Sequence, residues 1–237
     1  MPTLILARHG RSTSNTAGTL AGRTPGIALD QTGIAQAEAA ATRLSEVSLA
    51  AAYTSPLERC RQTARILLRD KDIRASAQRG IIEVDYGEWS GRRLAELARK
   101  PLWRTVQQQP SAARFPDGES LSEVSARAVT TVRRLDAQVA REHGGDAVWL
   151  AVSHGDVIKA VLADALGMHL DQFQRILVDP ASLSVIRYAD EGVAVLTMNS
   201  TSGSLAHLRS KSRRRRREAV VGGGTGSGAG AGSPRVS

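Results

Sequence analysis

The chain has 237 residues, of which 41% are hydrophobic and only 3% aromatic, so a large core is possible but small aliphatic side chains must fill most of it. The single cysteine, Cys60, excludes an internal disulfide framework and a metal site built from cysteines, and it suits a reducing compartment. Residues 205–237 carry most of the net charge of +9, because the rest of the chain holds basic and acidic residues in nearly equal number.

Residues 3–7 form a short apolar run, which predicts a buried strand. The run is much shorter than the hydrophobic part of a signal peptide, and no basic segment precedes it. Elsewhere no stretch approaches the roughly 20 apolar residues that a membrane span needs. We therefore expect a cytoplasmic protein that makes no contact with a membrane.

The next segments alternate between helical and strand patterns. Residues 32–47 carry apolar residues at a helical period, and residues 51–54 form a second short apolar run. The sequence from Ser55 to Glu58 is typical of a helix start, with Ser55 as the cap and Glu58 closing a capping box. These features predict a helix from Ser55 to about Arg69.

The second half of the chain continues the alternation. Residues 81–84 indicate a short strand or an extended segment, and two short helices separated by Pro101 are predicted between residues 92 and 109. Ser120 and Glu123 form a second capping box, ahead of a long helical pattern. The remaining predicted elements are a buried strand at 147–152, a helix at 155–166 that ends at Gly167, and two hairpin strands at 183–188 and 193–198.

Strands that alternate with helices predict an α/β sheet with helices on both faces. We assign this folded domain to residues 1–204. Residues 205–237 are of low complexity, with a basic block followed by glycine and serine, and we predict that they form a disordered tail. The block Arg213–Arg217 is a candidate for weak contacts with nucleic acid or acidic partners, although a solvated terminal extension explains it as well.

Two histidines stand in the same sequence context. His9 and His154 each follow an apolar strand and precede a glycine, which lets the backbone approach a ligand closely. Ligands of such sheets bind outside the carboxyl ends of the strands, where Arg8 also lies. Arg59 falls in the first turn of the helix after residues 51–54, so its side chain starts near the same edge. Two histidines, two arginines and a helix N-terminus together predict a site for a phosphoryl group.

These residue types also suggest a reaction. A neutral imidazole at His9 can attack phosphorus and form a phosphohistidine, while the arginines and the second histidine stabilise the charge of the transition state. A carboxylic acid must then protonate the leaving oxygen. Spacing alone leaves Glu83, Asp85 and Glu88 as rivals for that role. Three residues after His9 are candidates for further donors to the phosphoryl oxygens, namely Ser12, Ser14 and Asn15.

Five stretches of the chain, spanning residues 4 to about 165, resemble the signature motifs of the histidine phosphatase superfamily and occur in that family's order. They read "LARHGRSTSN", "TSPLERCRQTA", "EVDYGEWSGR", "FPDGES" and "VSHGDVIKA". The resemblance implies a phosphoglycerate mutase-like fold, which is a three-layer α/β/α sandwich around a mostly parallel sheet with one antiparallel edge strand. It also implies catalysis without a metal or another cofactor.

The resemblance further implies a role for individual residues. His9 matches the phosphorylated nucleophile, and Glu83 matches the proton donor, which selects it among the three acids. The rest of the phosphate pocket is matched by Arg8, Arg59 and His154, and secondary contacts to phosphate or substrate are matched by Asn15, Gly22 and the backbone of Gly155. Arg11 departs from the family's pattern, because many relatives carry glutamate or glutamine there, and the tail lies outside that pattern.

The expected function is hydrolysis of a small phosphorylated metabolite. The segment between "GEW" and "PDGES" is short, as in the family's phosphatases, although it contains several basic residues. A phosphoglycerate mutase-type phosphoryl transfer is the alternative, and a nucleic-acid-binding role of the tail is a third reading. The identity of the substrate and the oligomeric state stay open at this point.

Overall fold

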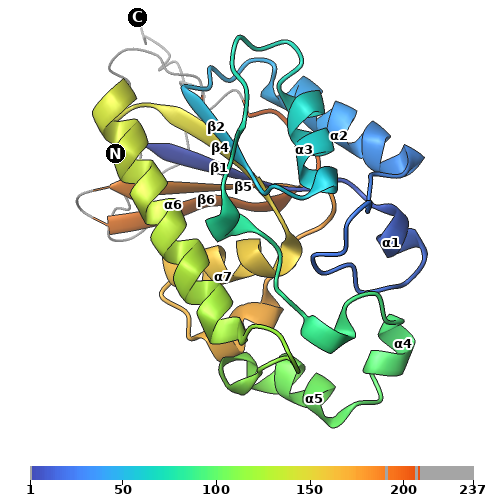
Figure 1. The fold of residues 1–237 in the computed structure, drawn as a ribbon. Helices are drawn as coiled ribbons and strands as arrows, with labels where there is room; N and C mark the ends of the chain where they lie inside the picture. Colours follow the sequence, from blue (N-terminus) through green and yellow to red (C-terminus); the bar gives the residue numbers. More distant parts are fainter. Residues whose placement is uncertain (1, 190–191, 206–207, 209–237) are drawn as a thin grey trace, which may run out of the picture.

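The computed structural model describes residues 2–189, 192–205 and 208, and its centre is a six-stranded sheet (Figure 1). The strands are β1 (Thr3–Arg8), β2 (Ala51–Thr54), β3 (Ser76–Ala77), β4 (Val148–Ser153), β5 (Leu183–Ala189) and β6 (Gly192–Ser200). They lie in the order β3-β2-β4-β1-β5-β6. The first four strands of this order are parallel, whereas β5 is antiparallel to both β1 and β6. The strand of opposite direction therefore lies one position inside the edge, because β6 adds a further strand beyond it.

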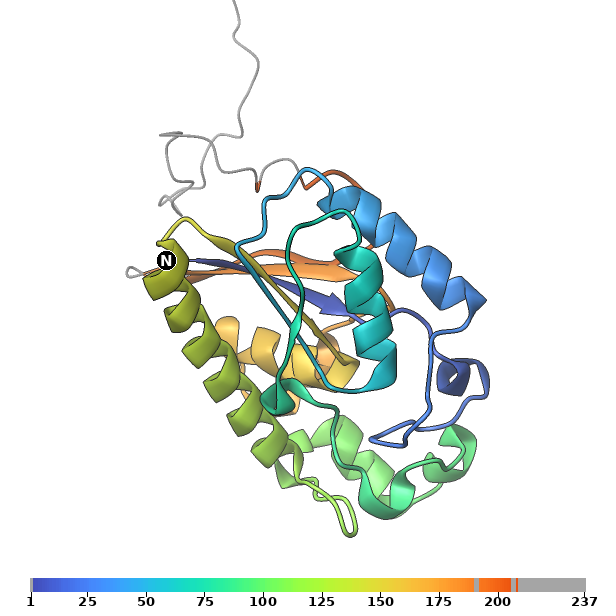
Figure 2. The same ribbon diagram turned by 45° about the horizontal axis from the view of Figure 1, so that its top comes forward.

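Helices cover both faces of the sheet. The α-helices are α1 (Thr13–Thr16), α2 (Gln31–Leu44), α3 (Glu58–Leu67), α4 (Leu94–Leu97), α5 (Pro101–Gln108), α6 (Leu121–His143) and α7 (Gly155–Ala165). Short 3₁₀ helices within residues 2–189 are η1 (Arg79–Ile81), η2 (Gly87–Trp89), η3 (Pro110–Ala112) and η4 (Leu170–Arg175). Helices α2 and α3 lie on one face and α6 and α7 on the other, as the two ribbon views show (Figures 1 and 2). The three-layer α/β/α architecture is thereby confirmed.

Alternation along the strands divides the core into two parts. In β1, Leu4 and Leu6 point into a cluster with α6 and α7, whereas Ile5 and Ala7 point into a cluster with α2 and α3. All four side chains are almost completely buried. A strand that is apolar on both faces is typical of the middle of a helix-covered parallel sheet.

The helix after β2 begins later than the sequence predicts. Helix α3 begins at Glu58, and its cap residue Leu57 makes no side-chain capping bond. Ser55 is not the helix cap, because its hydroxyl lies 2.7 Å from Nε2 of His154. The predicted capping box at this helix is therefore wrong, whereas the box of Ser120 and Glu123 at the start of α6 is confirmed.

Residues 81–84 are not a strand. Ile81 ends η1, residues 82–84 continue as an extended segment outside the sheet, and the strand beside β2 is the two-residue β3. The carbonyl oxygens of Gly80, Ile82 and Glu83 accept hydrogen bonds from the guanidinium of Arg127 at 2.9, 2.8 and 3.1 Å. Because a side chain holds these carbonyls, they are withdrawn from the ladder of bonds that a strand would need.

The loop after β1 packs directly against the start of α2. A Cβ atom added to Gly10 would lie 2.3 Å from the carbonyl oxygen of Gly33, and one added to Gly33 would lie 1.9 Å from that of Arg11. Both positions therefore require glycine for the close approach of two backbones. This contact holds the loop that follows the central strand.

The packed part of the chain extends slightly beyond the boundary at residue 204. Leu205 and Leu208 are buried in the same cluster as α2 and α3. The sequence did not predict this contact, because two leucines three positions apart give a weak signal in a segment that is otherwise basic and of low complexity. The rest of the predicted tail, including Arg213–Arg217, lies outside the described residues, so its disorder and its partners stay predictions.

Candidate active site

Three neighbouring strands bring the candidate catalytic residues together. His9 follows β1, His154 follows β4, and Arg59 lies in the first turn of α3 after β2. Because β2, β4 and β1 are adjacent and parallel, their carboxyl ends meet at one edge of the sheet. The rings of His9 and His154 are 5.3 Å apart between centroids, and both are buried, as is Arg59. The predicted clustering of these three residues is present.

The hydrogen bonds of His9 define its tautomer. Its Nδ1 lies 2.7 Å from the carbonyl oxygen of Gly10, which can only accept, so Nδ1 carries the proton. Nε2 of the neutral ring then carries a lone pair, and Nε of Arg59 donates to it at 3.3 Å. Burial and the charges of Arg59 and Arg8 hold the pKa of His9 well below its usual value. His9 is therefore a neutral imidazole with Nε2 available as a nucleophile.

Two arginines have buried N–H groups without a protein partner. Nη2 of Arg59 donates to the carbonyl of Gly22 at 2.9 Å, and Nη1 of Arg8 donates to that of Val178 at 2.6 Å. Nη1 of Arg59 and Nε of Arg8 are buried and have no hydrogen-bond partner. Buried donors are normally satisfied, so unpartnered ones beside a neutral imidazole indicate a place for an anionic ligand.

Hydrogen bonds also define the state of His154. Nη2 of Arg59 lies 3.2 Å from Nδ1, and a guanidinium only donates, so Nδ1 is the acceptor. The proton is consequently on Nε2, which donates to the hydroxyl of Ser55 at 2.7 Å. Burial, together with the charge of Arg59, lowers the pKa of His154 well below its usual value. The ring is neutral and held in one orientation.

Glu83 is the acid nearest to these groups. Its Oε2 lies 3.5 Å from Nδ1 of His154 and 3.9 Å from Nη2 of Arg59, and its Oε1 accepts from the backbone N–H of Val84 at 3.0 Å. Burial raises the pKa of Glu83 to about 7, and the charge of Asp156 adds to the rise while Arg59 opposes it. A carboxyl group with this pKa exchanges its proton near neutral pH.

The two rival acids are placed differently. The carboxylate of Asp85 accepts from the backbone N–H of Gly87 at 3.1 Å and forms an ion pair with Arg23 at 3.2 Å. Glu88 is exposed. Neither carboxylate forms a hydrogen bond or ion pair with His9 or His154, whereas the carboxyl group of Glu83 lies 3.5 Å from Nδ1 of His154.

Arg127 and Arg23 hold the backbone of Glu83 in place, and the sequence did not predict either residue as part of the site. Nη2 of Arg127 and Nε of Arg23 donate to the carbonyl oxygen of Glu83 at 3.1 and 2.9 Å. Both arginines also contact the carboxylate of Glu119 at 2.9 Å. The only sequence signal for Arg127 is a charge beside the apolar stripe of a long helix, and such arginines are usually solvated.

The predicted secondary contacts have local partners. Ser12 and Asn15 form a capping box at the start of α1, and the Ser12 hydroxyl also donates to the side-chain Oδ1 of Asn15 at 2.9 Å. The hydroxyl of Ser14 donates to the carbonyl of Thr19 at 2.9 Å. These interactions shape the loop after His9, and direct contacts of Ser12, Ser14 and Asn15 with a substrate stay predictions.

Two glycines and one arginine complete the surroundings. Gly22 has a φ of +51° and presents its carbonyl to Arg59, and Gly155 is the first residue of α7, where a Cβ atom would lie 3.6 Å from the guanidinium carbon of Arg8. Arg11, which departs from the family pattern, forms an ion pair with Asp30 at 2.7 Å. Its charge is thus partly neutralised at the rim of the site.

Residues 2–189, 192–205 and 208 contain no cluster of three or more histidine, cysteine, aspartate or glutamate side chains placed to hold a metal ion. In the same part of the chain, no helix is long and apolar enough to cross a membrane.

Comparison with known proteins identifies the family to which this chain belongs. The family model described as histidine phosphatase superfamily (branch 1) matches residues 4–201. Phosphoserine phosphatase 1 of Hydrogenobacter thermophilus is 32% identical over 203 residues, which cover 85% of this chain and 93% of that protein. The crystal structure of the α-ribazole phosphatase from Shigella flexneri has a TM-score of 0.75 at 26% identity, covering 84% of this chain and 97% of that one.

A second solved structure is that of a phosphoserine phosphatase mutant from Entamoeba histolytica in complex with phosphoserine. It has a TM-score of 0.74 at 26% identity and covers 85% of this chain and 98% of that one. The matched family model spans all the residues placed at the sheet edge above. The chain therefore belongs to branch 1 of the histidine phosphatase superfamily and is an enzyme of the histidine phosphatase type.

Proposed function

We propose that the protein hydrolyses phosphomonoesters and that His9 forms a phosphohistidine in each turnover. The observation that carries this proposal is that a nucleophilic nitrogen lies next to buried N–H donors that have no hydrogen-bond partner. Nε2 of a neutral, buried His9 lies beside Arg59, and one N–H group of Arg59 and one of Arg8 are buried without a partner. A phosphoryl group between them would satisfy both donors and place phosphorus next to the nucleophile.

In the first step, Nε2 of His9 attacks phosphorus and the bond from phosphorus to the ester oxygen breaks. Glu83 gives its proton to that oxygen, so the alcohol leaves as a neutral molecule. Arg8 and Arg59 bind the phosphoryl oxygens, and His154 joins them once the bound negative charge favours its protonated form. The pKa of about 7 at Glu83 supports this role, because both the protonated and the ionised form are present near neutral pH, so the group can give a proton and take one back.

In the second step, water attacks the phosphohistidine and the bond between phosphorus and Nε2 breaks. Glu83, now ionised, takes a proton from that water, and inorganic phosphate leaves. The carboxyl group returns to its protonated state and His9 to its neutral state. Because no step uses a metal ion, activity should be insensitive to a chelator.

We assign the substrate to the class of small phosphorylated metabolites. The similarity to two phosphoserine phosphatases and to an α-ribazole phosphatase supports hydrolysis of such molecules over mutase-type transfer. The short segment that carries α4 and α5, between the Glu83 region and α6, agrees with this choice. Phosphoserine is the first substrate to test.

A panel of phosphomonoesters tests the proposal, using phosphoserine, 3-phosphoglycerate, a sugar phosphate and p-nitrophenyl phosphate. We expect the wild type to release inorganic phosphate and to carry acid-labile phosphate when quenched during turnover. His9→Ala should lose both properties, whereas His143→Ala, at the exposed end of α6, should keep both.

The proposal would be wrong if His9→Ala kept more than a tenth of the activity, which is a loss below about 1.4 kcal/mol of transition-state stabilisation. Isomerisation of phosphoglycerate without release of phosphate would instead identify a mutase.

A further inference from the structure

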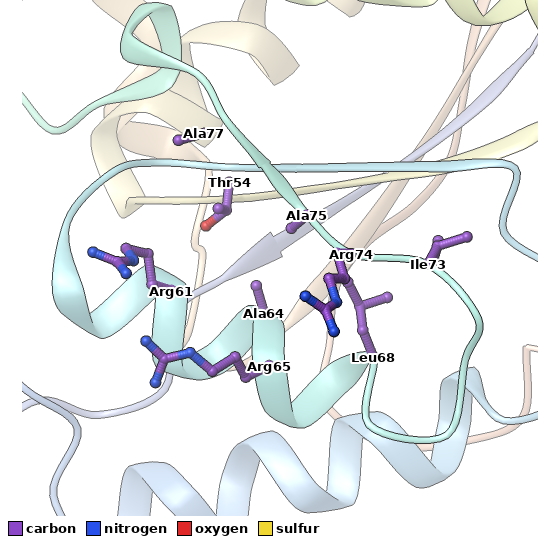
Figure 3. A pocket seen from close by; sticks show the side chains of 9 residues that line it. All are labelled: Thr54, Arg61, Ala64, Arg65, Leu68, Ile73, Arg74, Ala75 and Ala77. Atoms are coloured by element: carbon purple, nitrogen blue, oxygen red, sulfur yellow. The ribbon is translucent and has the colours of Figure 1, made fainter.

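A pocket of about 540 Å³ lies away from the catalytic cluster, between α3 and residues 73–77 at the β3 edge of the sheet. Figure 3 shows Arg61 and Arg65 rising from α3, and Arg74 extending from the opposite segment toward that helix. The floor and walls are apolar and consist of Ala64, Leu68, Ile73, Ala75 and Ala77. Thr54 at the end of β2 is the remaining lining residue.

The charge of this pocket has a single sign. None of its lining residues is acidic. Within the described part of the chain, the guanidinium groups of Arg61, Arg65 and Arg74 take part in no recorded hydrogen bond or ion pair. Some other exposed arginines have carboxylate partners, such as Arg114 with Glu123 at 2.6 Å and Arg133 with Asp164 at 3.0 Å, whereas others among the described residues, such as Arg99 and Arg141, are isolated and do not share one hollow. Three unneutralised cations around one hollow produce a positive potential inside it.

We propose that this pocket is a second ligand site, which binds a small organic anion with at least two negative groups and an apolar body. Sites for small molecules have volumes of about 300–1,000 Å³ and combine an apolar lining with a few polar groups, and this pocket meets both conditions. The apolar side chains would contact the body of the ligand. The guanidinium groups would bind carboxylate, sulfonate or phosphoryl oxygens in pairs.

Two other occupants fit the pocket less well. An added peptide strand would find only the two residues of β3 at this edge, too few for a continuous ladder of backbone bonds. The C-terminal segment of the chain is unsuitable because its block Arg213–Arg217 repeats the charge of the pocket. Charge and shape together favour a compact anion.

The test uses 1,3,5-benzenetricarboxylate as the probe, because it has three negative groups on a flat apolar ring and no phosphoester that the enzyme can hydrolyse. Binding is measured by titration calorimetry on the full chain, and the site is located by amide chemical shifts in NMR spectra. We expect saturable binding to the wild type that shifts the amides of Ala75 and Ala77.

Two triple variants carry the same loss of charge. Arg61→Gln/Arg65→Gln/Arg74→Gln should weaken binding at least tenfold. The control, Arg99→Gln/Arg141→Gln/Arg175→Gln, changes exposed arginines outside the pocket and should bind within about twofold of the wild type. Inorganic sulfate, which has charge but no apolar body, should bind at least tenfold more weakly than the probe.

Several results would overturn the proposal. Shifts confined to Gly10, Gly22 and Gly155 would place the probe at the catalytic cluster. Equal losses in the two triple variants would show attraction by net charge only. Absence of saturation up to about 10 mM probe would exclude a site of useful affinity. Equal binding of sulfate and the probe would show that the apolar body of the ligand contributes nothing to binding. None of these results bears on phosphohistidine formation at His9, so the two proposals can fail separately.

Discussion

The hydroxyl of Ser55 lies 2.7 Å from Nε2 of His154, and both residues are completely buried. The other ring nitrogen of His154 faces Arg59 and Glu83 at 3.2 and 3.5 Å. The hydroxyl of Ser55, directly after β2, therefore sets the orientation of the His154 ring, directly after β4. Ser55 is a positioning residue, since it acts on the site through His154.

Replacement of Ser55 by alanine should lower kcat more than it raises KM. The ring of His154 loses the hydrogen bond that fixes its proton on Nε2, which costs about 1–1.5 kcal/mol and corresponds to roughly a tenfold loss of rate. Steady-state kinetics on one substrate measure the effect. Ser122→Ala, which removes a bond of 2.9 Å to the carbonyl of Ser111 on the surface, is the matched control. Unchanged kinetics of Ser55→Ala would show that packing alone holds the ring.

Glu83→Gln should damage the hydrolysis of alkyl phosphates far more than that of aryl phosphates. An alkoxide needs a proton to leave, and a general acid contributes about 10²–10⁴-fold, whereas p-nitrophenolate leaves readily without one. For the wild type on an alkyl phosphate, the rate should fall as the pH rises above about 7, because Glu83 then loses its proton. The glutamine variant should lack this fall. The measurement is a set of pH–rate profiles for both proteins on both substrates.

Glu88→Gln is the control for that experiment, because Glu88 is exposed in the same segment and should leave the profiles unchanged. Equal losses by Glu83→Gln on alkyl and aryl substrates would mean that Glu83 is structural. Asp85 would then be the next candidate for the acid.

The raised pKa of Glu83 should also appear in the stability of the folded protein. Its ordinary value of 4.5 is raised to about 7, so between these pH values the folded state binds more protons than the unfolded state. The contribution of Glu83 to stability is therefore present below pH 4.5 and is lost as the pH rises to 7. Over this window, the free energy of unfolding of the wild type should fall relative to that of Glu83→Gln by on the order of 3 kcal/mol.

Urea unfolding at several pH values measures this difference. His9 and His154 have lowered pKa values and act in the opposite direction, but both proteins contain them, so the comparison largely removes their effect. A difference that does not vary with pH would show that the carboxyl of Glu83 titrates normally.

Arg127→Gln should destabilise the protein and weaken the action of Glu83. The substitution leaves the carbonyls of Gly80 and Ile82 without their guanidinium partner, and the Glu83 carbonyl and the Glu119 carboxylate keep only the guanidinium of Arg23, at a cost of roughly 2–4 kcal/mol in the free energy of unfolding. Because the segment that carries Glu83 loosens, activity on alkyl phosphates should fall more than on aryl phosphates. Arg134→Gln, which loses one bond of 3.2 Å to Gln78, is the control. Equal losses on the two substrates would limit Arg127 to a structural role.

The motifs predicted the meeting of His9, Arg59 and His154, because each follows or lies close to the end of a parallel strand and such ends converge. The architecture was predictable for the same reason, since apolar runs and helical periods alternate along the chain. The resemblance also selected Glu83, whose carboxyl group the structure places beside His154. Its role as the proton donor stays a prediction.

Other features depend on contacts between distant parts of the chain. Ser55 has the local pattern of a helix cap, but its hydroxyl bonds to His154, 99 residues further along. The segment at 81–84 has the composition of a strand, yet Arg127 occupies its carbonyls. In both cases a partner far away in the sequence outcompetes the local preference, and no local pattern records that partner.

The contact between Gly10 and Gly33 also limits how this enzyme can change. Cβ atoms at these positions would lie 2.3 and 1.9 Å from backbone oxygens, which cannot move aside without shifting the loop after β1. A saturation library at the two codons should therefore return glycine alone among active clones. By contrast, α4 and α5 lie outside the sheet and contain no glycine, so no close backbone contact there depends on one. Sequence variation can therefore accumulate in α4 and α5 while the loop after β1 stays invariant.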